Sequence, residues 1–328
     1  MKALVLQENG NIESLKVINN REIPQPGDND IQIRVHASGL NPSDYQMAMY
    51  PGIKDERERV LGLEISGIVT KIGKNVNKFK VGDRVYYLRG VMNLDGGFAE
   101  YSITPAHAAS HLPKEVSFYT AATIPAAGFT AYQAIIDKLR PKYGKTIFIE
   151  GGSGGVGYYA IQLAKMCGLK VIASCNSKNI NYIKEIEVDE IIAYDLENVY
   201  DRVKELTNNK GVNYILNTIN SETATKDLDV LSLDGEIAVI AGFPDFNKLT
   251  FFEKGISIHE IALSLPFQYN DYEGQCNIAR IGDEFATLLE KKQILSANIT
   301  LIDLEEVPLY LNKIKNREIL GKVVMKLL

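Results

Sequence analysis

The sequence predicts an α/β protein in which a doubly wound parallel sheet is joined to a second, β-rich domain. One observation is a glycine-rich turn between an apolar strand and a helix, within residues 146–167. Another is the alternation of strand-like and helix-like stretches from residue 144 to about 262, which is typical of a parallel sheet with helices on both faces. The third is a series of short strands before residue 118, which predicts a separate β domain.

The β-rich part begins with the apolar run MKALVL, and residues 31–37 alternate apolar and polar side chains with the period of a strand. Further strands are expected in EISGIVTKIG and VGDRVYY. Between them, residues 39–45 form a cluster of turn-forming residues at a strand end, where side chains are often presented to a ligand. A helix over residues 281–290 and a terminal strand from Gly321 are expected to return to this domain.

Helical spacing of apolar residues from Thr120 to Leu139 predicts a helix that ends before Pro141. We place the change of domain at the start of this helix. The expected domains are therefore residues 1–118 with 265–328, which are β-rich, and residues 119–264, which bind a dinucleotide.

The glycine-rich turn matches the G-x-G-x-x-G fingerprint, which lets a backbone turn tightly, approach a pyrophosphate and pack a helix on a strand. The helix that follows directs free N–H groups and the positive end of its dipole at the phosphates. Glycine-rich turns also connect elements that bind nothing, so the fingerprint needs its strand and helix context. The candidate residues in the turn are Gly152, Ser153, Gly154, Gly155, Val156 and Gly157.

The next strand ends at Ala173, where a Rossmann protein places the residue that meets the adenosine ribose. An NAD site usually has Asp or Glu there, and residues 174–181 contain neither. Ser174, Asn176 and Lys178 instead offer donors and positive charge, as a 2′-phosphate requires. We therefore expect NADP(H) rather than NAD(H), the alternative being a solvated loop with an incidental lysine.

Ligands of doubly wound sheets bind at the carboxyl ends of the strands. The candidates at the later strand ends are Tyr194, Asn217, Thr218, Ala241, Gly242 and Phe243.

The composition is that of an ordinary globular protein, with 328 residues, 45% hydrophobic and 23% charged residues. A net charge of −5 gives no broad attraction to nucleic acids or anionic membranes, so neither is an expected partner. The chain has three cysteines, no signal-like start and no apolar run of about 18 residues. These features predict a reduced, cytoplasmic protein.

Several blocks in family order resemble the medium-chain dehydrogenase/reductase superfamily, and within it the zinc-independent quinone oxidoreductase branch. The resemblance covers nearly the whole chain and implies a GroES-like domain plus a Rossmann domain. The blocks lie at residues 39–44, 61–73, 79–87, 96–101, 121–134, 151–165 and 321–324.

Zinc-dependent alcohol dehydrogenases of this superfamily have a cysteine near the position of Asn41 and a histidine where this chain has Leu63. Leucine cannot ligate zinc, which needs three protein ligands and an open position. Residues 86–98 also lack the cysteines of the structural zinc lobe. The four histidines are His36, His107, His111 and His259. None has a paired spacing with another ligand, so we expect no bound metal. His36 is interpreted as a strand residue whose side chain has protein partners.

The resemblance implies roles for several candidates. Asn41 would contact the nicotinamide side, and Tyr45 or Tyr50 would donate a phenolic proton to the substrate, although an aromatic wall or core role is equally open. Asp44 would orient them or cap a turn. Thr130 would lie near the nicotinamide, and Gly155 and Val156 at the pyrophosphate. Ser174, Asn176 and Lys178 would meet the 2′-phosphate, and Tyr194 would flank the adenine. Asn217 and residues 241–243 would line the nicotinamide ribose, and Lys322 would approach the cofactor from the closing strand.

Without zinc, the acceptor must already be activated by conjugation, so the expected reaction is hydride transfer from NADPH to a quinone or an α,β-unsaturated carbonyl. A dedicated enoyl-thioester reductase is one alternative. A catalytically weak NADPH-binding scaffold or sensor that acts through protein partners is another. Family likeness also suggests a homodimer, by edge pairing of the Rossmann sheets.

Overall fold

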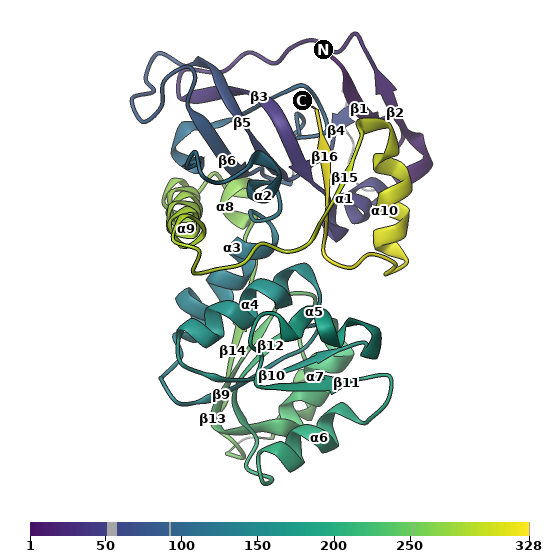
Figure 1. Ribbon diagram of the computed structural model, residues 1–328, viewed down its shortest axis with the longest axis vertical. Coiled ribbons are helices and arrows are strands. Elements are labelled where there is room, and N and C mark those ends of the chain that lie inside the picture. The colour runs from purple at the N-terminus through teal and green to yellow at the C-terminus, as the bar shows by residue number, and fades with distance from the viewer. Residues whose placement is uncertain (51–57, 92, 251, 328) are drawn as a thin grey trace. The chain divides into compact units, whose positions relative to one another are not determined.

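The computed structural model describes residues 1–50, 58–91, 93–250 and 252–327 (Figure 1). The chain divides into two compact units. The β unit comprises Met1–Phe129 and Leu263–Leu328, and the α/β unit comprises Thr130–Ala262. The predicted α/β fold class, with a β-rich part and a parallel sheet, is confirmed.

The β unit contains two sheets. The smaller has the strand order β2-β1-β4, and the larger has the order β15-β16-β3-β5-β6-β8, with β7 also paired to β3. These strands are β1 (Ala3–Leu6), β2 (Leu15–Ile18), β3 (Asp30–Gly39), β4 (Arg59–Val60), β5 (Glu64–Ile72), β6 (Arg84–Leu88), β7 (Tyr101–Pro105), β8 (Ser110–His111), β15 (Ile299–Ile302) and β16 (Lys322–Lys326).

Helices pack around these sheets. In Figure 1, α9 lies beside β6, and α10 lies beside α1. The helices of this unit are η1 (Ile12–Ser14), α1 (Pro42–Met49), η2 (Ala106–Ala108), α2 (Phe118–Ala121), α8 (Leu265–Gln268), α9 (Tyr272–Glu290), η6 (Leu304–Glu306) and α10 (Val307–Lys315), while α3 (Ala127–Tyr132) spans the division between the units.

Strand β3 shows why the β unit folds as it does. Its alternating residues Ile31, Ile33 and Val35 are all buried in one apolar cluster, as the period of a half-buried strand requires. The terminal strand β16 pairs antiparallel with β3, with Met325 opposite Ser38. The end of the chain therefore adds a strand to the larger sheet of the β unit.

The α/β unit is a six-stranded sheet in the order β11-β10-β9-β12-β13-β14, and every strand pair is parallel. This is the doubly wound order in which the first strand, β9, lies at the point where the direction of winding reverses. Helices α4 and α5 cover one face and α6 and α7 the other (Figure 1). The elements are η3 (Gln133–Leu139), β9 (Thr146–Ile149), α4 (Gly155–Met166), β10 (Lys170–Cys175), η4 (Ser177–Asn179), α5 (Ile180–Lys184), β11 (Glu190–Ala193), α6 (Val199–Leu206), β12 (Val212–Asn217), α7 (Ser221–Val230), β13 (Leu231–Val239), η5 (Phe246–Lys248) and β14 (Ser257–Glu260).

Two local predictions were wrong. The helix expected from Thr120 to Leu139 is interrupted, because α2 ends at Ala121 and α3 begins at Ala127, with Pro125 in the break and a π-helical last segment in η3. Apolar spacing continued across the break, but proline removes a backbone donor. The cluster expected at residues 39–45 does follow a strand end, because β3 ends at Gly39, but from Pro42 onward it is the start of α1 rather than a turn. Pro42 occupies the first helical turn, where its missing N–H costs nothing.

Candidate active site

The glycine turn of the α/β unit joins β9 to α4 and has the geometry that the fingerprint predicts. Gly151 has a φ of +75°, which glycine adopts at no steric cost. A Cβ on Gly152 would lie 2.9 Å from the Cβ of Ala173, and one on Gly157 would collide with the carbonyl oxygen of Gly151. These two glycines therefore allow close packing of the turn and helix against the strands.

Gly154 has a different role from the packed glycines. A Cβ there would meet only the Gly151 oxygen, at 3.2 Å, so its space is open rather than filled by protein. Gly154 is also the N-cap of α4 and brings no side chain to cap the first amide groups of the helix. An uncapped helix start beside an open glycine cradle fits the pyrophosphate of a dinucleotide.

The three residues predicted to meet a 2′-phosphate lie at the end of β10 and in the segment that follows it. Ser174 is 4% exposed, and its Oγ accepts from the amide of Gly151 at 3.4 Å, so its hydroxyl proton is directed elsewhere. The Asn176 side chain caps η4 by accepting from the amide of Lys178 at 3.2 Å. Lys178 is exposed. The end of β10 therefore lies next to the glycine turn, and Asn176 and Lys178 follow it.

An acid that sequence reasoning missed is hydrogen-bonded to the segment after β10. Asp195 follows β11, and its carboxylate accepts from the amide of Ser177 at 2.7 Å and from the Ser177 hydroxyl at 2.6 Å. Residues 174–181 contain no acid in sequence, but the neighbouring parallel strand supplies one in space. The available signal was that strands β10 and β11 end at the same edge of the sheet.

Asn217 ends β12 at the point where the winding of the sheet reverses, but its side chain is fully buried. Its Nδ2 lies 2.7 Å from Glu150 Oε2, 2.7 Å from Asp227 Oδ2 and 2.8 Å from Thr223 Oγ1, which is one more acceptor than the group has hydrogens. Burial raises the pKa of both Glu150 and Asp227. The Asn217 side chain therefore anchors a buried network.

The remaining candidates of the α/β unit differ in exposure. Tyr194 and Phe243 are 53% and 42% exposed, which leaves their rings free to contact a ligand. Thr130 is buried, Ala241 is exposed, and Gly242 has a φ of +146°.

In the β unit, Asn41, Glu64 and Lys322 form a buried triad. The Lys322 ammonium lies 2.7 Å from Glu64 Oε2 and donates to Asn41 Oδ1 at 2.6 Å, while Asn41 Nδ2 donates to the same Glu64 oxygen at 2.8 Å. Glu64 Oε1 accepts from the amide of Ala126 at 2.8 Å. The ammonium charge is thus matched by one carboxylate, and both polar ends of Asn41 have protein partners.

Asp44 links the start of α1 to the segment between β4 and β5. Its carboxylate accepts from the amides of Asn41, at 2.8 Å, and Gly62, at 3.1 Å. Burial raises the pKa of Asp44 to about 7, although the two amide donors oppose this shift. Tyr45, on α1, is partly buried against the core, whereas Tyr50, the residue that follows α1, is 58% exposed.

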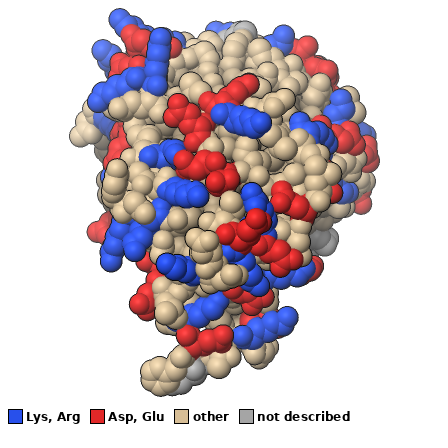
Figure 2. Space-filling view, turned by 60° about the horizontal axis from the view of Figure 1, so that its bottom comes forward, with Lys and Arg blue, Asp and Glu red and all other residues tan. Residues whose placement is uncertain are grey.

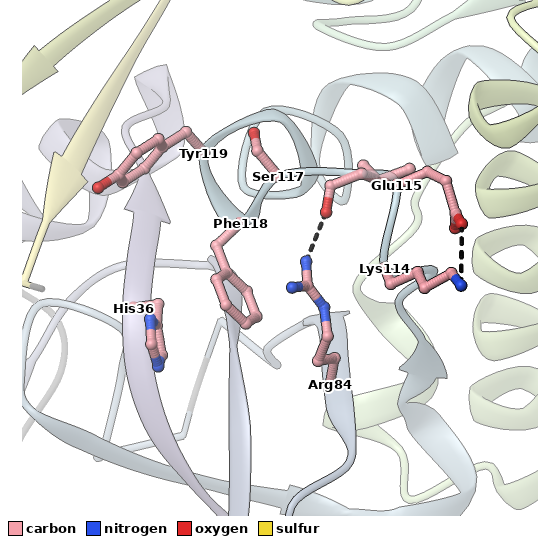
Figure 3. A pocket seen from close by; sticks show the side chains of 8 residues that line it. His36, Arg84, Lys114, Glu115, Ser117, Phe118 and Tyr119 are labelled. Atoms are coloured by element: carbon pink, nitrogen blue, oxygen red, sulfur yellow. Dashed lines mark hydrogen bonds and ion pairs between the residues drawn. The ribbon is translucent and has the colours of Figure 1, made fainter.

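A hollow of about 340 Å³ in the β unit is lined by His36, Arg84 and residues 114–119. Figure 3 shows the Phe118 ring between the His36 imidazole and the Arg84 guanidinium, whose centres lie 4.2 and 4.1 Å from the ring. Arg84 also donates to the carbonyl of Val116 at 2.5 Å. His36 is therefore held by stacking.

Across residues 1–50, 58–91, 93–250 and 252–327, no three His, Cys, Asp or Glu side chains come together in a way that could hold a metal ion. None of the helices in those ranges is long and apolar enough to cross a membrane. On the face shown in Figure 2, acidic and basic side chains are interspersed rather than gathered by sign.

Two family models match the chain: an alcohol dehydrogenase GroES-like domain at residues 27–114, and a zinc-binding dehydrogenase domain at residues 155–279. The chain is 32% identical to a quinone oxidoreductase of Sus scrofa over 267 residues, which cover 80% of each protein. It is 25% identical to a solved quinone oxidoreductase of Pseudomonas syringae pv. Tomato DC3000, with a TM-score of 0.85 and 99% of both chains covered. The CurK enoyl reductase shares the fold, with a TM-score of 0.84 at 23% identity over 99% of this chain and 98% of that one.

These relationships agree with the glycine cradle, the parallel sheet and the β-rich unit described above. The chain belongs to the quinone oxidoreductase family of the medium-chain dehydrogenase/reductase superfamily, and it is an oxidoreductase that uses a nicotinamide cofactor.

Proposed function

We propose that this protein reduces a quinone or an α,β-unsaturated carbonyl with NADPH and without a catalytic zinc. The observation that carries this proposal is the set of side chains at Asn41, Leu63 and Glu64. Bound NADPH supplies the hydride; the residues of this chain hold the nucleotide, position the acceptor and provide a proton.

The side chains at these positions do not fit a catalytic zinc. Leu63 has no donor atom, and it is 6% exposed. Asn41 and Glu64 bind each other and the ammonium of Lys322, so their oxygens already have partners and the carboxylate is already paired with a cation. A zinc site needs three protein ligands and an open position, and this arrangement offers neither.

An acceptor reduced without a metal must already be electrophilic, as quinones and conjugated carbonyls are. Hydride addition places negative charge on the carbonyl oxygen, and a phenol is a suitable hydrogen-bond donor and proton source for it. Tyr50, just after α1, is exposed, and Tyr45 lies on α1. We assign this role first to Tyr50 because its side chain is not committed to the core.

The preference for NADPH is supported by the loop after β10. Ser174 and Asn176 carry polar groups suited to a phosphate, and Lys178 adds an exposed ammonium. Gly154 and the uncapped start of α4 would hold the pyrophosphate.

The deciding experiment is a panel of quinones, enones and enoyl thioesters, each assayed with NADPH and with NADH. The proposal is supported if the wild type and Tyr269→Phe turn over quinones or enones and Tyr50→Phe does not. Tyr269 is the control because it is an exposed tyrosine on a different element. Turnover confined to enoyl thioesters favours the dedicated enoyl-thioester reductase. Nucleotide binding without turnover of any acceptor favours the scaffold or sensor.

We also propose that the protein acts in the cytoplasm as a homodimer. The strand β14 is at the edge of the parallel sheet and pairs only with β13 among the described elements. An open edge can pair with the same edge of a second copy. A monomeric mass by light scattering, across micromolar concentrations, would rule the dimer out.

A further inference from the structure

Asp195 contacts the segment after β10, where a Rossmann protein reads the adenosine ribose, but it follows a different strand from the acid of an ordinary NAD site. It lies two residues beyond the end of β11, next to β10 in the parallel sheet. Its two carboxylate oxygens each bind Ser177, one through the amide at 2.7 Å and the other through the hydroxyl at 2.6 Å. The carboxylate is exposed, but both of its oxygens are held by Ser177.

This arrangement uses both hydrogen-bond donors of Ser177. A 2′-phosphate binds through donors and positive charge, and Ser177 could otherwise offer an N–H and an O–H beside Lys178. Asp195 also adds a negative charge near the ammonium of Lys178, and the pKa of Asp195 is lowered, chiefly by the Ser177 hydroxyl, so the acid is ionised at neutral pH. A 2′-phosphate would carry about −1.5 to −2 charge, so it would be repelled by Asp195 and would find the Ser177 donors already occupied. A ribose hydroxyl is neutral and can itself donate, so it meets neither obstacle.

We propose that Asp195 sets the cofactor specificity of this loop, by competing with the 2′-phosphate of NADP(H) for Ser177 and by partly neutralising Lys178. The proposal rests on the nucleotide site described above. It makes Asp195 a residue that restrains the preference for NADPH without contributing to the hydride transfer. Removing the charge of Asp195 should therefore strengthen the preference for NADPH over NADH, although Asp195 lies outside the Ser174–Lys178 segment.

Asp195→Asn tests this with little change to the loop, because the amide oxygen can still accept from the Ser177 amide. Asp229→Asn is the matched control: Asp229 is exposed near the end of α7, and this helix leads away from the carboxyl edge of the sheet toward β13. Dissociation constants for NADPH and NADH are measured by calorimetry for the wild type and both variants. Adenosine 2′,5′-bisphosphate and adenosine 5′-monophosphate serve as probes of the adenosine half alone.

We expect the ratio of the NADH to the NADPH dissociation constant to rise about tenfold in Asp195→Asn, equivalent to about 1.4 kcal/mol, and to stay unchanged in Asp229→Asn. The bisphosphate should gain affinity by a similar factor relative to the monophosphate. An unchanged ratio with both nucleotides still bound would overturn the role of Asp195 and leave the proposed function standing. If the ratio of the NADH to the NADPH dissociation constant is near one in the wild type and rises in Asp195→Asn, the role of Asp195 is supported. The same result would refute the proposed preference of the wild type for NADPH.

Discussion

The ammonium of Lys322 lies 2.7 Å from the carboxylate of Glu64, and their side chains are only 5% and 0% exposed. The two residues come from β16 and β5, and β3 lies between these strands in the larger sheet. Asn41 completes the arrangement by binding both. A charge buried in this way is stable only while its partner is present, because solvation by water has been lost.

Lys322→Met should therefore destabilise the protein by about 3–5 kcal/mol, since it leaves the Glu64 charge buried without a cation. Lys326→Met is the matched control: Lys326 lies on the same strand, and its pair with Asp303 is 3.6 Å long and exposed. That variant should lose about 1 kcal/mol or less. Urea unfolding measures both, and equal losses would show that the buried pair has no special importance.

Asp44 predicts a pH dependence of stability. Its pKa is raised from 3.8 to about 7 by burial, so between these values the folded state binds a proton that the unfolded state releases. The free energy of unfolding contributed by this group is therefore largest below pH 4, falls as the pH rises to about 7, and is constant above it. The full difference is up to about 4 kcal/mol.

The variant Asp44→Asn has no proton to lose. We expect the difference in unfolding free energy between wild type and variant to shift in favour of the variant from pH 5 to pH 7, and then to level off, as measured by urea unfolding at each pH. A difference that is flat across this range would mean that the acid is ionised in the folded protein.

Much of the α/β unit could be predicted because its signals are local. The strand, glycine turn and helix from Thr146 to Met166 are contiguous, so spacing alone fixes the element types. The Asn41–Lys322 bond joins residues 281 positions apart, and no pattern in either segment indicates it. The role of Asp195 could not be predicted from the sequence for the same reason. Its partner Ser177 is 18 residues away, and the two meet only because the ends of two parallel strands lie side by side.

The fingerprint glycines offer a matched pair of substitutions. Gly157→Ala places a methyl group against the Gly151 oxygen and 2.8 Å from the Gly152 Cα, and backbone atoms cannot yield easily. We expect a loss of about 1–3 kcal/mol in stability. Gly154→Ala meets one atom, at 3.2 Å, and the φ of −76° and ψ of 166° at this residue suit alanine.

Gly154→Ala should therefore keep its unfolding free energy within about 0.5 kcal/mol of wild type while weakening nucleotide binding about tenfold or more. The methyl group would fill the space open to the pyrophosphate. Thermal unfolding and calorimetric titration with NADPH separate the two effects. Unchanged affinity in Gly154→Ala would place the pyrophosphate elsewhere.

Lys178→Glu tests the charge that the NADPH preference depends on. The ammonium is exposed, so its attraction to a phosphate is screened by salt, and the loss should be about tenfold in NADPH affinity at low ionic strength and smaller at high salt. NADH has no phosphate at this position and should keep its affinity. Lys210→Glu, which makes the same charge change at an exposed position just before β12, controls for a general effect of net charge. Equal weakening of both nucleotides by Lys178→Glu would show that the lysine does not face the 2′-phosphate, because only a contact made by the phosphate itself can distinguish the two cofactors.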